Sequence, residues 1–429
     1  MQSRCIQKFS VEGDLATLKQ QILIWCDQFD YCCFLDSHHY TTPGEESRCL
    51  AAAGVSQIFT TDGDPKILLE AAEKYNDWLF GHFSYQSFHA RFGLPEPVLP
   101  SGYFAGTLLF CPETVFELTG NLLTISTLAP SAETIWKNIC QIDSTPLQQP
   151  LPTVQFTADL DPGIYMKKVE ALLDHIQRGD CYEINFCQEF HATPVTIPVL
   201  NTYVQLMAVS PNPFSGFYKN DGNYVLCASP ERFLQKKGNQ IRSQPIKGTI
   251  RRNTANPEQD EILKQTLRNS TKNQSENIMV VDLVRNDLSR VCREGTVRVA
   301  ELLGLYTFPQ VHQLISTIEG ELLPGTTLLD VMRATFPMGS MTGAPKKKVM
   351  ELIEQYEATP RGIYSGSIGY ITPQKDFDWN VVIRSLVYLS SEQYLSYHVG
   401  GGITTNSDPQ QEWEECQVKA RAIQSLWEK

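Results

Sequence analysis

Three glutamates lie on two predicted helices from which their side chains could share one divalent cation. Glu412 and Glu415 are three residues apart near the end of the chain, so they project from one face of a helix. Glu276 lies in a second, longer predicted helix that covers residues 257–287. Magnesium prefers such oxygen ligands, in a near-octahedral shell that keeps several waters. Glutamates at this spacing are also typical of a solvated surface, where Glu415 would pair with Lys419, so both interpretations stay open.

An acid and a lysine follow one another at the ends of strand-like segments. The segment Ser229–Phe233 ends a predicted strand and carries Glu231, and Lys247 lies sixteen residues further on, before Gly248 and Thr249. A lysine removed from water has a lowered pKa and becomes a nucleophile, and a nearby glutamate can act as acid or base. A surface lysine in a turn is the alternative. The spacing of a phosphate-binding GxxxxGK[ST] loop is absent here.

Three further features suit an anionic ligand. Gly400–Gly402 follow a predicted strand, let the backbone approach a ligand closely and offer N–H groups to a carboxylate; a tight turn is the alternative. Arg384 lies in an otherwise apolar predicted strand, 379–389, where a buried guanidinium needs an anion from a ligand or from the protein. His312 is a lone histidine in an apolar context, a pattern more typical of a core residue than of a catalyst.

The composition argues against several classes of partner. The 429 residues carry 36 Lys and Arg against 48 Asp and Glu, which gives a net charge of −12 and a pI near 5.2. Such a field repels nucleic acid and anionic membranes, so neither is expected as a partner. No run of roughly eighteen apolar residues predicts a membrane span, and the N-terminal segment lacks the apolar core of a secretory signal. The twelve scattered cysteines are expected to be reduced thiols, and a cytoplasmic location follows as the default.

The chain changes character near residue 150. Before this point short strand-like runs alternate with few helices, and the polar, proline-rich stretch 144–152 predicts a connection. After it, amphipathic helices are interspersed with strands, and the last helix begins at the capping residue Asp408, before Pro409. Runs of strands broken by helices, without a steady β-α-β rhythm, predict an α+β fold with large antiparallel sheets. We therefore expect an N-terminal lobe over 1–150 and a second region over 160–429.

Seven segments, in their order along the chain, resemble the chorismate-utilising enzymes, a family that includes anthranilate, aminodeoxychorismate, isochorismate and salicylate synthases. Each is weak evidence alone, but seven in register are specific. They are GDCYEIN (179–185), SPERF (229–233), PIKGT (245–249), ENIMVVDLVRNDLSRV (276–291), FPMGSMTGAPK (336–346), YSG (364–366) and GGGITTNSDP with EWEE (400–415). The resemblance implies two large, mostly antiparallel sheets packed face to face with helices outside. It also implies that 160–429 is the chorismate-binding catalytic region.

Two positions indicate the branch of the family. Members that add water to the substrate carry a lysine base where this chain has Glu183, so isochorismate and salicylate synthesis are not expected. Anthranilate synthases typically have alanine at the position of Lys247, whereas PIKGT is the form of the aminodeoxychorismate-forming branch. The resemblance therefore implies conversion of chorismate and ammonia to 4-amino-4-deoxychorismate, for the synthesis of 4-aminobenzoate and folate. Anthranilate synthesis is the enzymatic alternative, and a non-catalytic subunit that senses chorismate or tryptophan is a third hypothesis.

The resemblance also implies chemical roles for the residues introduced above. Lys247 would attack C2 of chorismate as the 4-hydroxyl leaves, after which ammonia would enter at C4 and expel the lysine. Glu231 would be the general acid or base near the departing hydroxyl. Glu276 and Glu415 would bind Mg²⁺ directly and Glu412 would bind it through water, and the ion would hold the ring carboxylate.

Further residues would bind the substrate. His312, placed with the catalytic residues, would line the ring together with Gly248 and Thr249. The enolpyruvyl carboxylate would be held by Tyr364, Arg384 and the backbone of Gly400, Gly401 and Gly402. Asn273 stands where many relatives carry an acid, which predicts weaker binding of the metal.

Two more expectations concern other partners and ligands. No cysteine lies in the tight glycine turn of a glutaminase, so ammonia is expected from a separate glutamine amidotransferase subunit. The residues Leu35, Asp36 and Ser37 resemble a strand that builds a tryptophan pocket in some relatives. A tryptophan pocket in the N-terminal part is therefore a hypothesis.

Overall fold

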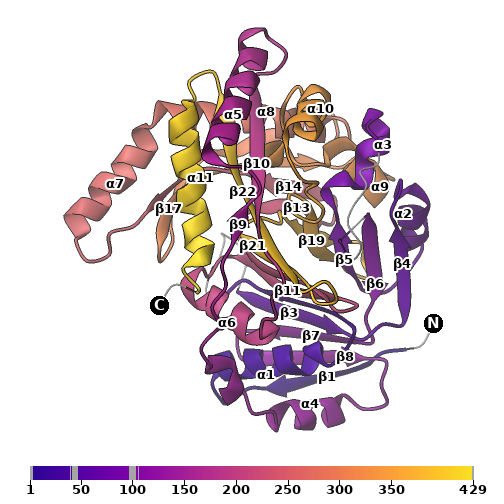
Figure 1. Ribbon diagram of the computed structural model, residues 1–429. Coiled ribbons are helices and arrows are strands. Elements are labelled where there is room, and N and C mark those ends of the chain that lie inside the picture. Colours follow the sequence, from indigo (N-terminus) through magenta and orange to yellow (C-terminus); the bar gives the residue numbers. More distant parts are fainter. Residues whose placement is uncertain (1–2, 39, 41–46, 96–102, 105, 428–429) are drawn as a thin grey trace.

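The computed structural model describes residues 3–38, 40, 47–95, 103–104 and 106–427. Large sheets form the middle of the molecule and most helices lie outside them (Figure 1). The helices of the described residues are α1 (Leu15–Asp27), α2 (Lys66–Glu73), α3 (His89–Phe92), α4 (Ala132–Cys140), α5 (Pro162–Gln177), α6 (Val199–Val209), α7 (Pro257–Asn269), α8 (Thr271–Ser289), α9 (Leu328–Thr335), α10 (Lys346–Tyr356) and α11 (Pro409–Gln424). Among them, no helix has both the length and the apolar character that crossing a lipid bilayer requires.

The first sheet has twelve strands in the described residues, and all of its pairs are antiparallel. In spatial order they are β1 (Cys5–Ser10), β8 (Leu122–Thr127), β7 (Thr114–Thr119), β3 (Arg48–Ala53), β2 (Tyr31–Asp36), β11 (Phe214–Asn220), β12 (Asn223–Ser229), β21 (Ser385–Leu389), β22 (Tyr394–Thr404), β10 (Glu183–Ala192) and β18 (Gly343–Ala344), with β9 (Thr157–Ala158) beside β10.

The second sheet has ten strands in the described residues, and it too is antiparallel throughout. In spatial order they are β15 (Ile246–Arg251), β17 (Val311–Glu321), β14 (Gln240–Gln244), β13 (Arg232–Lys237), β20 (Phe377–Asn380), β19 (Ser367–Ile371), β5 (Leu79–Phe83), β6 (Thr107–Cys111) and β4 (Gln57–Thr61), with β16 (Arg298–Thr307) beside β17.

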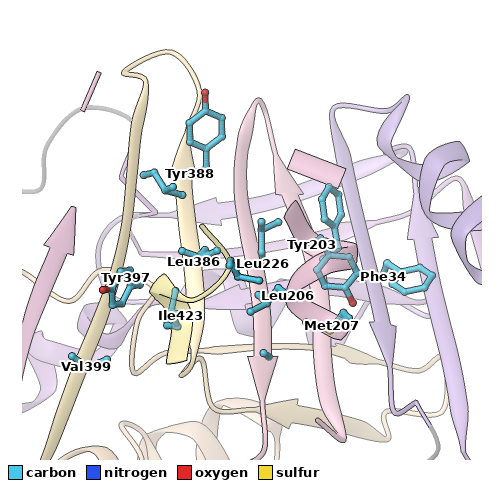
Figure 2. Close-up of a cluster of buried hydrophobic side chains, with 14 of the residues drawn as sticks. Phe34, Tyr203, Leu206, Met207, Leu226, Leu386, Tyr388, Tyr397, Val399 and Ile423 are labelled. Carbon is cyan, nitrogen blue, oxygen red and sulfur yellow. The ribbon is translucent and has the colours of Figure 1, made fainter. Parts of the chain in front are cut away.

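The buried side chains divide into three clusters, which define the layers. One cluster joins the facing sides of the two sheets and includes Cys33 and Val225 from the first sheet and Phe110 from the second. A second cluster lies between the first sheet and helices such as α6 and α11; Figure 2 shows Leu206 and Ile423 of these helices over the strands. A third lies between the second sheet and α2, α8 and α9. The order helices, sheet, sheet, helices confirms the expected α+β fold.

Both sheets combine strands from before and after residue 150. In the first sheet β2 pairs with β11, and in the second β5 pairs with β19. Each sheet therefore contains strands from both sides of residue 150, so the two sheets do not correspond to the two parts of the chain. The division into a lobe at 1–150 and a region at 160–429 stays a prediction from the sequence.

Local capping explains which predicted elements are correct. The helix α11 begins as expected, because the Asp408 carboxylate accepts a hydrogen bond from Gln411 N (2.9 Å) and Pro409 takes the first helical position. The single helix predicted over 257–287 is wrong. It is two helices, α7 and α8, because Ser270 has extended backbone angles (φ −69°, ψ 108°) and its hydroxyl caps a new helix start.

Candidate active site

The predicted nucleophile lies where an edge strand of the second sheet meets the first sheet. Lys247 is on β15, and its Nζ donates a hydrogen bond to Glu183 Oε1 on β10 (2.9 Å). Only 11% of the Lys247 side chain and 3% of the Glu183 side chain are exposed. A Cβ on Gly402 would lie 2.8 Å from Glu183 Oε1 and 3.3 Å from Lys247 Nζ, so this glycine leaves room for the ion pair. Glu183 is thus the ion-pair partner of Lys247. In the sequence it was noted only because some relatives carry a lysine base at its position.

A bulge follows Lys247 at the predicted glycine. The pairing of β15 with β17 shifts register between Ile246 and Thr249, and Gly248 has φ +92°. A Cβ at this position would lie 3.1 Å from the Asn273 side chain, so both the backbone angle and the space favour glycine. A bulge of this kind re-aims neighbouring side chains, here those of Lys247 and Thr249.

The charge state of Lys247 differs from the sequence-based expectation. Burial alone would lower its pKa, but the carboxylates of Glu183, Glu276 and Glu231 have the larger effect and raise the pKa of Lys247 above its usual range. The free protein therefore holds Lys247 as an ammonium ion. A nucleophilic role requires that this group first lose a proton, and Glu183 is its hydrogen-bonded acceptor.

Glu231 lies between β12 and β13, close enough to Lys247 for their charges to interact. Its side chain is buried, and burial raises its pKa to about 7, although a hydrogen bond from Ser340 and the charges of Lys247 and Arg384 oppose the shift. A carboxyl group with this pKa exists in both protonation states near neutral pH. It can therefore donate a proton to a leaving group or accept one.

This pKa predicts a pH dependence of turnover. If protonated Glu231 delivers a proton to the leaving hydroxyl, the rate should fall about ten-fold per pH unit above about pH 7, because the protonated fraction falls in that proportion. The measurement is kcat/KM from pH 6 to 9 for the wild type and for Glu231→Gln, because kcat/KM reports the pKa values of the free enzyme. The variant should be slower by about 10²–10⁴-fold and should lack this limb of the profile. A variant with the same limb would assign it to another group.

Arg384 is placed differently from the expectation. The predicted strand 379–389 is two strands in different sheets, β20 and β21, and Arg384 lies at the crossing between them with φ +52°. Burial lowers the pKa of Arg384, and the charges of Glu231 and Tyr40 oppose this. No side chain in the described ranges makes a hydrogen bond or ion pair with its guanidinium, which is available for an anionic ligand beside Glu231.

The three glutamates predicted to bind metal converge, but on a lysine that the sequence analysis missed. Lys272 Nζ lies 3.0 Å from Glu412 Oε1, 3.8 Å from Glu415 Oε2 and 4.0 Å from Glu276 Oε1. Within the described part of the chain, no three acidic, histidine or cysteine side chains are already close enough to hold an ion. Glu276 Oε1 is nevertheless buried without a hydrogen-bond partner among the described residues, and burial raises the pKa of Glu276 to about 7. The donor set and the orphaned oxygen fit a hard divalent cation.

The glycine run is part of a strand, not a turn after one. Gly400, Gly401 and Gly402 lie within β22 and pair with β10, opposite Cys187, Phe186 and Asn185. A Cβ at Gly401 would lie 3.3 Å from Glu412 Oε2 and 3.8 Å from Glu415 Oε1. The run thus connects the metal-binding candidates, at Gly401, with the Lys247–Glu183 pair, at Gly402.

Tyr364 lies beside the same strand. Its hydroxyl is 3.3 Å from Cys187 Sγ, opposite Gly400, and its ring stacks on His398 with centroids 4.8 Å apart. The structure thus places Tyr364 near Gly400. These two residues were expected to hold the enolpyruvyl carboxylate together.

His312 is held away from a free catalytic role in this conformation. Its Nε2 lies 3.2 Å from Asp260 Oδ1 on α7 and its Nδ1 lies 3.0 Å from Thr307 Oγ1. Arg252 anchors the other oxygen of Asp260 with two hydrogen bonds (3.0 and 2.8 Å). Asp260 could not be predicted as a partner of His312, because a single acid on an amphipathic helix is typical of a solvated face. A catalytic part for His312 stays a prediction.

The segment predicted to form a tryptophan pocket does line a cavity. The cavity has a volume of about 330 Å³, lies between the two sheets, and is bordered by Leu35, Asp36 and Ser37 together with residues of β11, β13 and β19. The Asp36 carboxylate accepts hydrogen bonds from Lys19 Nζ (2.8 Å) and His38 N (2.9 Å). The room suits a small ligand.

We expect calorimetry to show that tryptophan binds at one site per chain. Leu35→Trp, which fills the cavity with an indole from its own wall, should abolish the heat of binding while unfolding temperature and turnover stay near wild type. A wild-type protein that gives no heat with tryptophan would remove this hypothesis.

The chain is similar in sequence to known proteins over much of its length. The family model for chorismate binding enzymes matches residues 36–425. The "Aminodeoxychorismate synthase component 1" of Klebsiella aerogenes is 40% identical over 271 residues, 63% of this chain and 59% of that protein. The "Anthranilate synthase component 1" of Thermus thermophilus is 35% identical over 286 residues, 65% of this chain and 61% of that protein. The chain thus spans about three fifths of the length of these relatives.

A solved structure shows the same fold. Anthranilate synthase component I from Streptococcus pneumoniae superposes with a TM-score of 0.76, covering 90% of this chain and 93% of that chain at 24% identity. A likeness at this identity concerns the fold alone. Because the family match covers most of the chain and includes every candidate site residue except Leu35, the chain belongs to the family of chorismate binding enzymes.

Proposed function

We propose that this chain converts chorismate and ammonia to 4-amino-4-deoxychorismate. The observation that carries the proposal is the buried Lys247, hydrogen-bonded to Glu183 and within electrostatic reach of Glu231, in a chain of the chorismate binding family. Relatives named aminodeoxychorismate synthase, at 33–40% identity, support the same activity.

The proposed reaction uses these residues in sequence. Lys247 gives a proton to Glu183, and its neutral Nζ attacks C2 of the ring while the bond from C4 to the hydroxyl oxygen breaks. Glu231 donates a proton to that oxygen, which leaves as water. Ammonia then bonds to C4 and the bond from C2 to Nζ breaks; the new ammonium group gives one proton to Glu231, and Glu183 returns its proton to Nζ. The net change exchanges a hydroxyl for an amino group and leaves Lys247, Glu183 and Glu231 in their starting protonation states.

The remaining groups bind and orient the substrate. Arg384, with Tyr364 and the backbone of the glycine run, would hold the enolpyruvyl carboxylate. Glu276, Glu412 and Glu415 would hold Mg²⁺, which neutralises the ring carboxylate when it is bound. The glycine run lies on β22, which pairs with β10, and the three glutamates lie on the helices α8 and α11.

Ammonia supply and location complete the proposal. A separate glutamine amidotransferase subunit would supply ammonia, so a matching partner should allow glutamine to replace ammonium. The cytoplasmic location expected from the sequence stays a prediction.

The test is the product formed by the purified chain from chorismate, Mg²⁺ and ammonium, resolved by chromatography and mass. The proposal expects aminodeoxychorismate without release of pyruvate. Formation of anthranilate with pyruvate would favour anthranilate synthesis, the second candidate function. The 35% identity to the anthranilate synthase component 1 of Thermus thermophilus supports that candidate. A folded chain that binds chorismate but forms no product, even with partner and glutamine, would favour a sensor.

A further inference from the structure

One lysine serves as the common ion-pair partner of all three glutamates proposed to bind metal. Lys272 Nζ approaches Glu412, Glu415 and Glu276 at 3.0, 3.8 and 4.0 Å. We propose that Lys272 is an intramolecular counter-ion of this site, which a divalent cation must displace and which thereby sets the affinity for the cation. The inference rests on the Mg²⁺ site of the proposed function.

Lys272 neutralises the cluster incompletely. It brings one positive charge to three carboxylates, and only Glu412 is within hydrogen-bond distance of it. Glu276 Oε1, at 4.0 Å, is buried and has no hydrogen-bond partner in the described ranges. A divalent cation binds carboxylate oxygens at about 2.0–2.1 Å and carries twice the charge. Exchange of the ammonium for such a cation would therefore give a direct ligand to the Glu276 oxygen, which Lys272 leaves without a hydrogen bond.

In this cluster Lys272 is exposed, as is Glu415 (46%), whereas the carboxylates of Glu412 and Glu276 are buried. The Lys272 side chain is 41% exposed, whereas the Glu412 and Glu276 side chains are 3% and 10% exposed. The Ser407 hydroxyl donates a second hydrogen bond to Glu412 Oε1 (2.6 Å), which holds this carboxylate in place. Lys272 lies in the first turn of α8 on a flexible four-carbon stem, so its charge can swing into water without being buried elsewhere.

A second lysine nearby is as exposed as Lys272 but pairs with only one of the three glutamates, and it provides a comparison. Lys419 Nζ pairs with Glu415 Oε1 (2.8 Å) and donates to the carbonyl oxygen of Gly400 (2.7 Å). It is therefore tied to the backbone of β22, and among the three glutamates its ion pair is with Glu415 alone. Replacing Lys419 with a neutral residue removes one positive charge, as replacing Lys272 does, but it leaves Lys272 in place among the three glutamates.

The test is calorimetric titration of Mg²⁺ into the metal-free full chain, for wild type, Lys272→Met, Lys419→Met and Lys264→Met. Among the residues that the structure describes, Lys264 pairs only with Glu261 of its own helix, so it serves as a surface control for the lost charge. We expect Lys272→Met to lower the Kd for Mg²⁺ about ten-fold or more, Lys419→Met to lower it less than about three-fold, and Lys264→Met to leave it unchanged.

Thermal unfolding gives a second readout that does not depend on turnover. Without metal, Lys272→Met should unfold at a lower temperature than wild type, because the carboxylates repel one another without their counter-ion. Added Mg²⁺ should raise its unfolding temperature more than that of wild type. Equal Kd values and equal shifts in wild type and Lys272→Met would overturn the inference and leave the metal site standing. Absence of Mg²⁺ binding in every folded variant would overturn both, while the product assay would still decide the proposed activity.

Discussion

Replacing Lys247 with alanine is expected to lower formation of aminodeoxychorismate by about a thousand-fold or more, because the covalent step loses its nucleophile. Lys247 Nζ donates a hydrogen bond to Glu183 and interacts electrostatically with Glu231, and in the proposed reaction it is the attacking group. Residual turnover that drifts toward anthranilate would support the assignment of this lysine as the branch marker. The measurement is the rate and identity of product with saturating ammonium.

Two further variants separate nucleophilic from electrostatic loss. Lys247→Arg keeps a positive charge beside Glu183 but cannot act as a nucleophile at ordinary pH, so it should be as inactive as the alanine variant. The alanine variant leaves Glu183 as an unpaired buried charge, which typically costs about 3–5 kcal/mol of stability. Adding Glu183→Gln to Lys247→Ala should restore much of that stability without restoring activity. Full activity in either Lys247 variant would remove the nucleophile assignment.

Glu276→Gln should abolish Mg²⁺-dependent turnover while the fold stays intact. The glutamine keeps the shape of the side chain but removes the negative charge that a hard cation needs, and the loss should exceed the about 10–100-fold that removal of an outer-shell partner typically costs. Turnover measured against Mg²⁺ concentration, with circular dichroism as the check on folding, reads out the effect. Unchanged Mg²⁺ dependence would contradict the metal assignment.

Glu414→Gln is the matched control. Glu414 lies on α11 between Glu412 and Glu415, but it is exposed and accepts a hydrogen bond from Gln410 Nε2 (2.8 Å) instead of facing the cluster. The same chemical change on the same helix should therefore leave both turnover and Mg²⁺ dependence at the wild-type level. A loss equal to that of Glu276→Gln would point to a general effect of surface charge.

Helix boundaries that depend on contacts between neighbouring residues could be predicted from the sequence. Asp408 and Pro409 fix the start of α11 through contacts within one helical turn, so this boundary could be read directly. Ser270 is a capping residue type as well, but the helical pattern on both sides hid the break between α7 and α8. The change of sheet at Arg384 could not be predicted. Arg384 has φ +52°, but a non-glycine residue in an apolar stretch does not indicate a positive φ in the sequence, and the pairing of β20 and β21 in different sheets determines it.

The residues of the candidate site could be predicted, but their partners could not. The family motifs indicated Lys247, Glu231, Glu276, Glu412 and Glu415 as a set, and the structure places them around two connected ion clusters. Their partners could not be predicted, because these contacts join distant parts of the chain. Glu183 is 64 residues from Lys247 and on the other sheet, and Lys272 is 140 residues from Glu412. The raised pKa of Lys247 follows from the proximity of Glu183, Glu276 and Glu231, which the sequence does not show, so burial alone predicted the wrong direction.

The most direct test of the central claim is the mass of the intact chain after mixing with chorismate and Mg²⁺ while ammonium is withheld. The account predicts a covalent adduct of chorismate minus one water, located at Lys247 by peptide mapping and absent from Lys247→Arg. Adding ammonium should release the adduct as aminodeoxychorismate. Formation of that product at the full rate by Lys247→Arg, with no adduct on the wild-type chain, would contradict the account.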